Sequence, residues 1–250
     1  MFVPMSDQHL SQIATHWTLL FDAHRGPEDA AQKARKTLMI RYCGAVYRYL
    51  ARIVRDQGIA EDLTQEFALR FLQGKFSQAA PTAGKFRNYV KTALFHLVQD
   101  HYRAVGARSK LVPMADDYQP AAPDENEAAE QAFRESWRSE LLARAWNALN
   151  DVQRQSGQPF HDVMKLRVDS PDLSSAQLAE ALGNKLGRIY TPAGLRQLLH
   201  RARERFSELL LQEVELSLQG SGGLDRLEEE LADLQLLKYC QDLIDRRKNS

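Results

Sequence analysis

The stretch that decides the fold runs Ser174-Ser175-Ala176-Gln177-Leu178-Ala179-Glu180-Ala181-Leu182-Gly183. Ser174 or Ser175 can cap the N-terminus of a helix, because a serine hydroxyl accepts a hydrogen bond from a backbone N–H of the first turn. Ala179 is small at the position where a second helix would cross closely, and Gly183 suits a left-handed turn residue. The stretch therefore predicts the first helix and the turn of a helix-turn-helix.

A second helix is expected to begin at Thr191-Pro192, since threonine is a good N-cap and proline is favoured at the first helical position. The apolar residues of this helix share one face: Leu195, Leu198, Leu199, Ala202, Phe206 and Leu209. With about 100° per residue, Arg196, His200 and Arg203 lie within about 60° of one another on an adjacent face. An amphipathic helix with an arginine-rich polar face offers side chains for base edges and cations for phosphates, as a recognition helix requires.

The same two helices also fit a simpler interpretation, a helical hairpin with a solvated basic face. Residues 184–190 would make a turn longer than the usual length of about 3–4 residues. A turn of this length leaves the register of the base contacts open.

Helical periodicity extends from this motif through nearly the whole chain of 250 residues, and no run alternates with period two. The segments with helical spacing are 7–25, 28–57, 59–73, 85–105, 128–152, 160–168, 174–182 and 192–218. Gly58 and Gly74 separate three of them, as expected at helix ends. The pattern predicts an all-α fold.

The charges of the chain are divided among its segments, although the formal net charge is zero. Residues 85–110 and 185–205 are basic, whereas residues 116–130 are acidic. Residues 106–126 also contain three prolines and few large apolar side chains, which favours a flexible acidic linker. Two basic helical blocks joined by an acidic tether fit bipartite DNA binding.

The C-terminal segment begins with a glycine-rich hinge at residues 219–223. Regularly spaced leucines after the hinge indicate a helix or a helical hairpin, which we expect to pack on the preceding domain. Cys43 and Cys240 have no disulfide-framework or metal-site spacing, so a reduced, cytosolic protein is expected. We expect no membrane span, secretory signal, cofactor or metal, because the apolar runs are short and the histidines are scattered.

Several stretches together resemble the extracytoplasmic-function (ECF) sigma factors, the minimal two-domain members of the bacterial sigma factor family. They are Arg41-Tyr42-Cys43-Gly44-Ala45-Val46-Tyr47-Arg48-Tyr49-Leu50, Ala60-Glu61-Asp62-Leu63-Thr64-Gln65-Glu66-Phe67, Gly84-Lys85-Phe86-Arg87-Asn88-Tyr89-Val90, Asp100-His101-Tyr102-Arg103 and His200-Arg201-Ala202-Arg203-Glu204-Arg205-Phe206. The resemblance covers roughly residues 11–218 and is specific in combination. It implies sigma domain 2 at 1–105, an acidic linker at 106–127, sigma domain 4 at 128–218 and a helical extension at 219–250.

The resemblance also implies partners and the residues that contact them. Glu61, Asp62 and Gln65 would face the clamp helices of the largest subunit of core RNA polymerase, and the second domain would lie near the flap of the second-largest subunit. The non-template strand of the −10 element would be held by Lys75, Phe76, Lys85, Phe86, Arg87, Asn88 and Lys91. The −35 duplex would be read by Arg196, Gln197, His200, Arg201 and Arg203. Such a chain directs polymerase to promoters and has no catalytic activity of its own; an anti-sigma factor is a further possible partner.

Other interpretations stay open at this point. Glu61 and Asp62 also fit a plain structural role, because acidic side chains stabilise the N-terminal end of a helix dipole. An enzyme is disfavoured, since the chain has no phosphate-binding glycine loop, paired histidines on a helix or nucleophile elbow. A stand-alone DNA-binding regulator explains the helix-turn-helix but not the first block, and a protein-binding adaptor that kept the fold is a third alternative.

Overall fold

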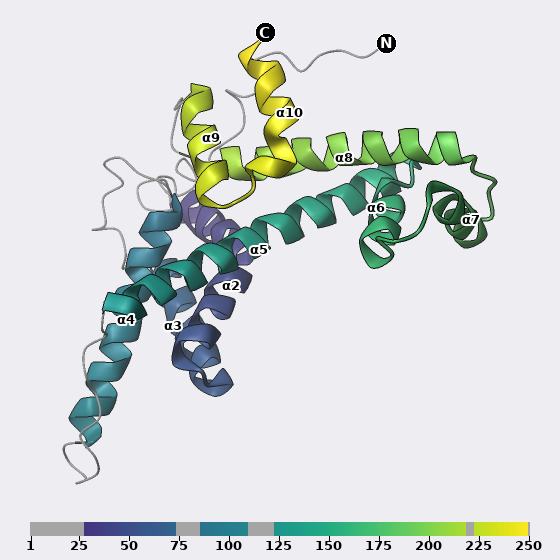
Figure 1. Ribbon diagram of the computed structural model, residues 1–250. Helices are drawn as coiled ribbons and strands as arrows, with labels where there is room; N and C mark the ends of the chain where they lie inside the picture. The colour runs from purple at the N-terminus through teal and green to yellow at the C-terminus, as the bar shows by residue number, and fades with distance from the viewer. Residues whose placement is uncertain (1–27, 74–85, 110–122, 219–222, 250) are drawn as a thin grey trace. The chain divides into compact units, whose positions relative to one another are not determined.

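The computed structural model describes residues 28–73, 86–109, 123–218 and 223–249, and every regular element in these ranges is a helix (Figure 1). The helices are α2 (Glu28–Val54), α3 (Gln57–Leu72), α4 (Phe86–Ser109), α5 (Pro123–Ser156), α6 (Phe160–Asp169), α7 (Ser175–Leu186), α8 (Pro192–Glu215), α9 (Gly223–Asp233) and α10 (Leu237–Lys248). The predicted all-α fold is confirmed. The helix expected at 7–25, the loop at 74–84, residues 110–122 of the linker and residues 219–222 of the hinge lie outside the described residues.

The chain forms two compact units whose boundaries differ from those expected. The first unit contains the described residues of 1–140 together with 215–234. The second unit contains 141–214 together with 235–249. The expected boundaries lay at 105, 127 and 218, so both the first part of α5 and all of α9 fall in a different unit from the one the sequence suggested.

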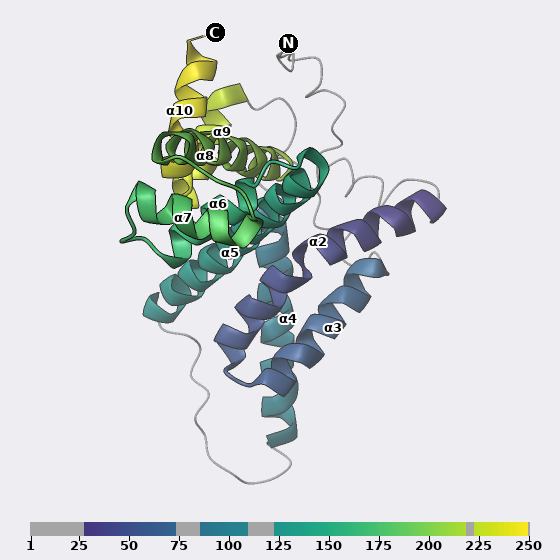
Figure 2. The ribbon, with the colours of Figure 1, turned by 90° about the vertical axis from the view of Figure 1, so that its right-hand side faces the viewer.

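The first unit is built on α2, α3 and α4, which lie side by side in Figures 1 and 2. One face of α2 is buried, at Tyr42, Ala45, Val46, Tyr49 and Leu50, with the spacing of an amphipathic helix. A short turn leads into α3, where the Asp56 carboxylate accepts a hydrogen bond from the Ile59 N–H at 2.8 Å and so caps the helix.

The first part of α5 completes this core through aromatic contacts. The rings of Tyr42 and Trp137 are stacked with centroids 4.5 Å apart and planes within 5° of parallel. Tyr49 meets Phe133 edge to face at 5.3 Å. Arg48 forms an ion pair with Glu140 at 2.5 Å, next to these rings. Because these aromatic residues share the buried side of α2, residues 128–140 belong to the first unit and not to the second.

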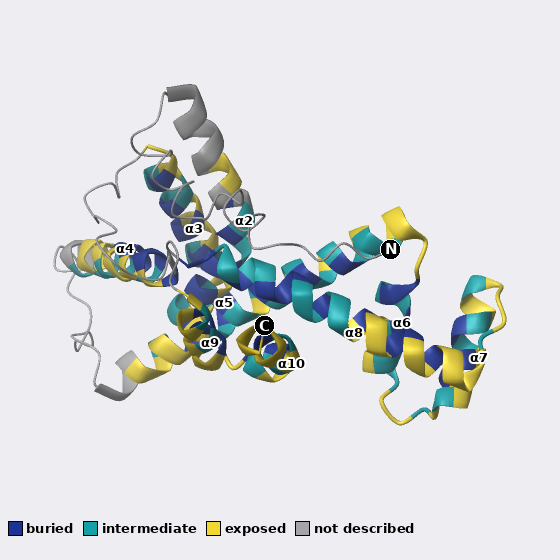
Figure 3. Ribbon diagram, turned by 90° about the horizontal axis from the view of Figure 1, so that it is seen from above, coloured by how far each residue is buried: buried dark blue, intermediate teal, exposed yellow. Residues whose placement is uncertain are grey.

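The second unit consists of the remainder of α5 with α6, α7, α8 and α10. Every helix of this unit has buried positions, which are coloured dark blue in Figure 3. The buried residues include Leu141, Ala145, Leu149, Val163, Leu178, Leu182, Leu195, Leu199, Ala202, Phe206, Cys240 and Ile244. Phe206 joins three helices, since its ring lies 5.9 Å from Trp146 and 6.5 Å from Tyr239. Arg144 and Glu213 link α5 to α8 through an ion pair at 3.0 Å.

The C-terminal segment forms two helices that belong to different units. In the second unit, α10 packs as expected: the Ser207 hydroxyl donates to the Tyr239 carbonyl oxygen, and Arg246 pairs with Glu204 at 2.9 Å. The expectation that the whole extension packs on the second domain is wrong for α9, which belongs to the first unit. The apolar stripe of α9, Leu227 and Leu231, is buried there.

Candidate partner and nucleic-acid interfaces

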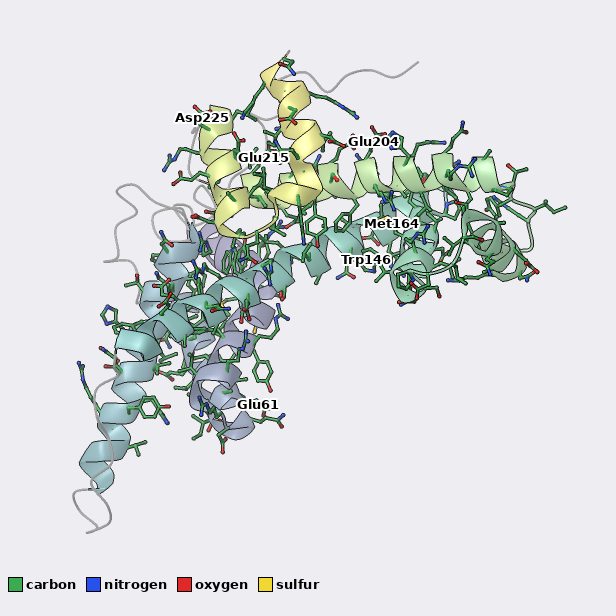
Figure 4. All side chains as sticks on the ribbon, in the orientation of Figure 1. Glu61, Trp146, Met164, Glu204, Glu215 and Asp225 are labelled. Carbon is green, nitrogen blue, oxygen red and sulfur yellow. The ribbon has the colours of Figure 1, made fainter. Side chains whose placement is uncertain are left out.

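The acidic motif lies on the solvent side of α3. Glu61, Asp62 and Gln65 are all exposed, while Leu63 and Phe67 on the same helix are buried. Figure 4 shows Glu61 near the end of α3 that follows the turn from α2. Among the described residues, neither carboxylate has an ion-pair partner. This surface is therefore free to meet a basic partner.

The residues expected at the −10 element lie partly outside the described ranges, namely Lys75, Phe76 and Lys85. Phe86 begins α4 and Asn88 is exposed on that helix. Lys91 is partly exposed and pairs with Glu130 at 2.5 Å. The aromatic and apolar residues of α4, such as Tyr89 and Leu94, are buried in the first unit. These side chains therefore form part of the core of that unit.

Arg87 is held differently from the other expected −10 residues. Its side chain is buried, and its guanidinium donates to both carboxylate oxygens of Glu230, through Nε at 3.0 Å and Nη2 at 3.1 Å. Nη2 also lies 3.4 Å from a carboxylate oxygen of Asp233. In this conformation α9 occupies the side of α4 where DNA was expected.

Sequence reasoning missed this contact, although a signal for it exists. Glu230 lies within the stripe of Leu227, Leu231 and Leu234, which are all buried. A carboxylate on the apolar face of a helix must find a buried cation or hydrogen-bond donors, because burial of an unpaired charge is costly. The position of Glu230 on an apolar face therefore indicated that its carboxylate pairs with a residue far away in the sequence.

The helix-turn-helix differs from expectation at its turn. Ser174 caps α7 in a capping box with Gln177, with hydrogen bonds of 3.3 and 2.9 Å. The left-handed residue is Gly187, with φ of 64°, and not Gly183. Gly183 lies inside α7, where an added Cβ would come within 2.7 Å of the Arg188 carbonyl oxygen. Because α7 continues to Leu186, the connection to α8 is shorter than residues 184–190 suggested.

The basic side chains of α8 lie as the periodicity predicted. All six residues of the expected apolar face are buried, and Arg196, Gln197, His200, Arg201 and Arg203 are exposed. The Thr191 hydroxyl accepts a hydrogen bond from the Gly194 N–H at 3.0 Å, which confirms the N-cap. The Arg201 guanidinium lies 5.5 Å from the centroid of the Phe160 ring of α6, which favours a cation–π contact. The polar face of α8 is therefore presented to solvent on a firmly packed helix.

A cavity of about 730 Å³ lies in the second unit beside this face. Its walls include Trp146 and Met164, which are labelled in Figure 4, and Tyr239 of α10. His200 and Arg203 also line it, so two of the expected −35 residues border on the C-terminal helix.

The carboxylate of Asp162 connects α5, α6 and α7, the three helices that come before the recognition helix α8. The Asp162 carboxylate of α6 accepts hydrogen bonds from Lys185 of α7 and from Gln153 of α5, both at 2.7 Å. Partial burial alone would raise the pKa of Asp162, but these two hydrogen bonds outweigh it and hold the pKa below its ordinary value of 3.8. The contribution of this carboxylate to stability is therefore fully present above pH 3.8 and is lost as the pH falls through the lower, folded pKa.

We expect Asp162→Asn to lower the free energy of unfolding at pH 7 by about 1–2 kcal/mol, because the hydrogen bonds lose their charge. The difference in free energy of unfolding between wild type and Asp162→Asn should narrow as the pH falls below 3.8. Urea unfolding followed by circular dichroism at several pH values measures both effects. Asp172→Asn, at an exposed position, serves as the control and should change stability by less than about 0.5 kcal/mol. A gap that does not depend on pH would contradict this role for Asp162.

The described ranges contain neither a metal-binding cluster nor a membrane-spanning helix. No group of three or more histidine, cysteine, aspartate or glutamate side chains there is placed to hold a metal ion. No helix in those ranges has the length and apolar character needed to cross a membrane. Both cysteines are free thiols, and burial together with the neighbouring Glu140 carboxylate raises the pKa of Cys43.

The comparisons with known proteins agree with this arrangement. A family model described as Sigma-70 region 2 matches residues 38–108, which include most of α2, all of α3 and nearly all of α4. The chain is also similar to the ECF RNA polymerase sigma factor SigE of Mycolicibacterium smegmatis, with 27% identity over 217 residues that cover 83% of this chain and 76% of that protein. No solved structure matches the chain.

The match to Sigma-70 region 2, the exposed acidic motif and the helix-turn-helix together support the class of bacterial sigma factors. The similarity to an ECF sigma factor over 83% of the chain supports the extracytoplasmic-function type within that class. A stand-alone DNA-binding regulator is not favoured, because it leaves the region 2 match unexplained.

Proposed function

We propose that this sigma factor binds core RNA polymerase through Glu61, Asp62 and Gln65 and directs the enzyme to promoters. The observation that carries the proposal is the exposed acidic motif, free of ion-pair partners in the described residues and set in the part of the chain that matches Sigma-70 region 2. Carboxylates that face solvent on a packed helix attract a basic partner surface and fix its orientation. The contacted surface is the clamp helices of the largest subunit.

The −10 element is held as a single strand by the start of α4 and the segment before it. Asn88 and Lys91 supply a polar and a cationic side chain on α4, and Lys75, Phe76, Lys85, Phe86 and Arg87 complete the set. Unstacking and unpairing a base costs a few kcal/mol, and stacking on an aromatic side chain returns about 1–3 kcal/mol per base. Binding energy therefore promotes strand separation, while polymerase performs the chemistry.

The −35 element is read as duplex by α8. Arg196 and Gln197 lie near the N-terminal end of this helix, and His200 and Arg203 lie one and two turns further on, all exposed. Arg201 adds a cation for the phosphate backbone. The functional division that the family resemblance implies is sigma domain 2 at 1–105, a linker at 106–127 and sigma domain 4 at 128–218, although residues 128–140 pack in the first compact unit. Sigma domain 4 contacts the flap of the second-largest subunit. The chain acts in the cytoplasm, where polymerase works, and an anti-sigma factor is a candidate regulator.

Co-elution with bacterial core RNA polymerase tests this proposal. We expect the Glu61→Lys/Asp62→Lys double variant to bind core enzyme at least about tenfold more weakly than wild type, which corresponds to about 1.4 kcal/mol. The matched control is Asp172→Lys/Glu180→Lys, which makes the same charge change at exposed positions of the second unit and should stay within about twofold of wild type. If folded wild-type protein does not bind its cognate core enzyme, the proposed function fails. Equal binding by both double variants would move the interface elsewhere.

A further inference from the structure

Helix α9 buries a charged pair that connects it to α4 across 143 residues of sequence. The side chain of Glu230 is completely buried and that of Arg87 is 7% exposed. The two hydrogen bonds between them, at 3.0 and 3.1 Å, are parallel and use two nitrogens of the guanidinium. Such a bidentate pair is the strongest geometry available between these two groups.

The pair makes Arg87 unavailable to any other anion. An arginine that donates to both oxygens of a buried carboxylate cannot at the same time donate to a phosphate or to a base edge. Asp233 takes up a further direction of the same guanidinium, at 3.4 Å from Nη2. Docking of α9 and contact of Arg87 with DNA are therefore mutually exclusive.

Helix α9 is strongly acidic. Its eleven residues contain five carboxylates and one arginine. The described part of α4 nearest to it carries Arg87 and Lys91, and both are paired with acidic side chains. A strongly acidic helix is thus held on the basic side of α4 by an apolar stripe and a buried ion pair. The apolar stripe of α9 is buried in the first unit, and the carboxylates of Glu230 and Asp233 contact Arg87, a cation that could otherwise neutralise the phosphates of a strand.

We propose that α9 is an intramolecular competitor of the −10 strand: while it is docked, Arg87 is blocked, and its release is required for single-stranded promoter DNA to bind. The proposal rests on the function proposed above and adds a regulatory step to it. In a two-state description, the apparent affinity for DNA falls by the fraction of molecules in which α9 is undocked. Weakening the Arg87–Glu230 pair raises that fraction and so strengthens DNA binding.

The test uses the full-length chain and a fluorescein-labelled pool of single-stranded DNA of random sequence. Binding is measured by fluorescence anisotropy at about 50 mM salt, where phosphate contacts are strong. We expect Glu230→Gln to bind this pool about five- to tenfold more tightly than wild type. Glu229→Gln is the matched control, since it removes the same charge from an exposed neighbouring position, and it should change affinity by less than about twofold.

A further variant separates competition from a merely structural role of the pair. If the gain arises from a freed Arg87, the double variant Arg87→Gln/Glu230→Gln should lose it. A Glu230→Gln protein that is less stable but binds DNA no more tightly than wild type would overturn the proposal. The same preparations are tested for binding to core RNA polymerase. Binding to core RNA polymerase without a gain in DNA affinity would reject only the proposal that α9 competes with DNA. Absence of binding to core RNA polymerase would reject the proposed function.

Two measurements cover the case in which Glu230→Gln does not fold. Asp233→Asn removes the outer, half-exposed partner of Arg87 and should raise DNA affinity about two- to threefold. In the wild-type chain, addition of the DNA pool at a saturating concentration should speed amide hydrogen exchange in α9, because the docked helix is displaced. Unchanged or slower exchange in α9 on DNA binding would contradict the displacement.

Discussion

Trp137→Ala is expected to lower the free energy of unfolding by about 3–5 kcal/mol, the range for removal of a fully buried aromatic ring. Trp137 is completely buried, stacks on Tyr42 at 4.5 Å and lies 5.8 Å from Phe133. Its removal leaves a cavity between α2 and α5, the two helices that it joins. Urea denaturation followed by circular dichroism, with the slope and midpoint both fitted, measures the loss.

The matched control for this prediction is Phe95→Ala in the same unit. Phe95 lies on α4 and is 46% exposed, so its truncation should cost less than about 1 kcal/mol. Trp137→Phe should lose less than the alanine variant, because most of the ring volume is kept. A loss below about 1.5 kcal/mol for Trp137→Ala would show that α5 is not a part of the first unit's core.

The second large effect concerns the buried pair of Arg87 and Glu230. We expect Arg87→Leu to destabilise the chain by about 3–5 kcal/mol, because the Glu230 carboxylate is left buried without its cation. Replacing both residues, in Arg87→Leu/Glu230→Leu, should restore stability to within about 1 kcal/mol of wild type or exceed it, since desolvation of the two charges is avoided.

Chemical denaturation of the wild type, the two single variants and the double variant forms a complete thermodynamic cycle. Arg52 and Glu135 provide a comparison pair at the surface of the same unit, with side chains 55% and 28% exposed. Removing either of these two should cost no more than about 1 kcal/mol. Additive losses in the Arg87–Glu230 cycle would mean that the two side chains do not interact in solution.

Local signals in the sequence predicted much of the second unit. The spacing of the leucines and arginines along α8 predicted both its buried face and its exposed basic face, because an α-helix completes one turn every 3.6 residues. Residue type alone predicted a cap at Ser174 or Ser175 and another at Thr191, and the structure has Ser174 and Thr191 in these roles. Caps and amphipathic faces depend on residues within one or two turns, so they can be read from a short window.

The position of the turn in the helix-turn-helix could not be predicted from such a short window of sequence. Gly183 and Gly187 are both compatible with a left-handed conformation, and the sequence alone does not choose between them. The choice depends on Arg188, whose backbone carbonyl passes so close to Gly183 that a side chain there would clash. The position of the turn thus depends on contacts between residues, which the conformational propensities of single residues do not describe.

Long-range partners were the least predictable part. The partner of Glu230 was not predicted, because nothing near Glu230 in the sequence indicates Arg87. Phe133 and Trp137 were likewise assigned to the second domain, since they follow the linker in the chain. The contacts of these residues join positions far apart in the sequence, as the Arg48–Glu140 and Arg87–Glu230 ion pairs illustrate with separations of 92 and 143 residues.

The first unit is built from two segments that lie far apart in the sequence, and this affects how the protein is made. Residues 215–234 contribute to that unit, so its core is incomplete until these residues have been synthesised. Glu230 emerges 143 residues after Arg87, an interval of roughly 7–30 s at translation rates of about 5–20 residues per second. A nascent chain therefore presents Arg87 without its acidic helix for that time, and the ion pair forms only after Glu230 has left the ribosome.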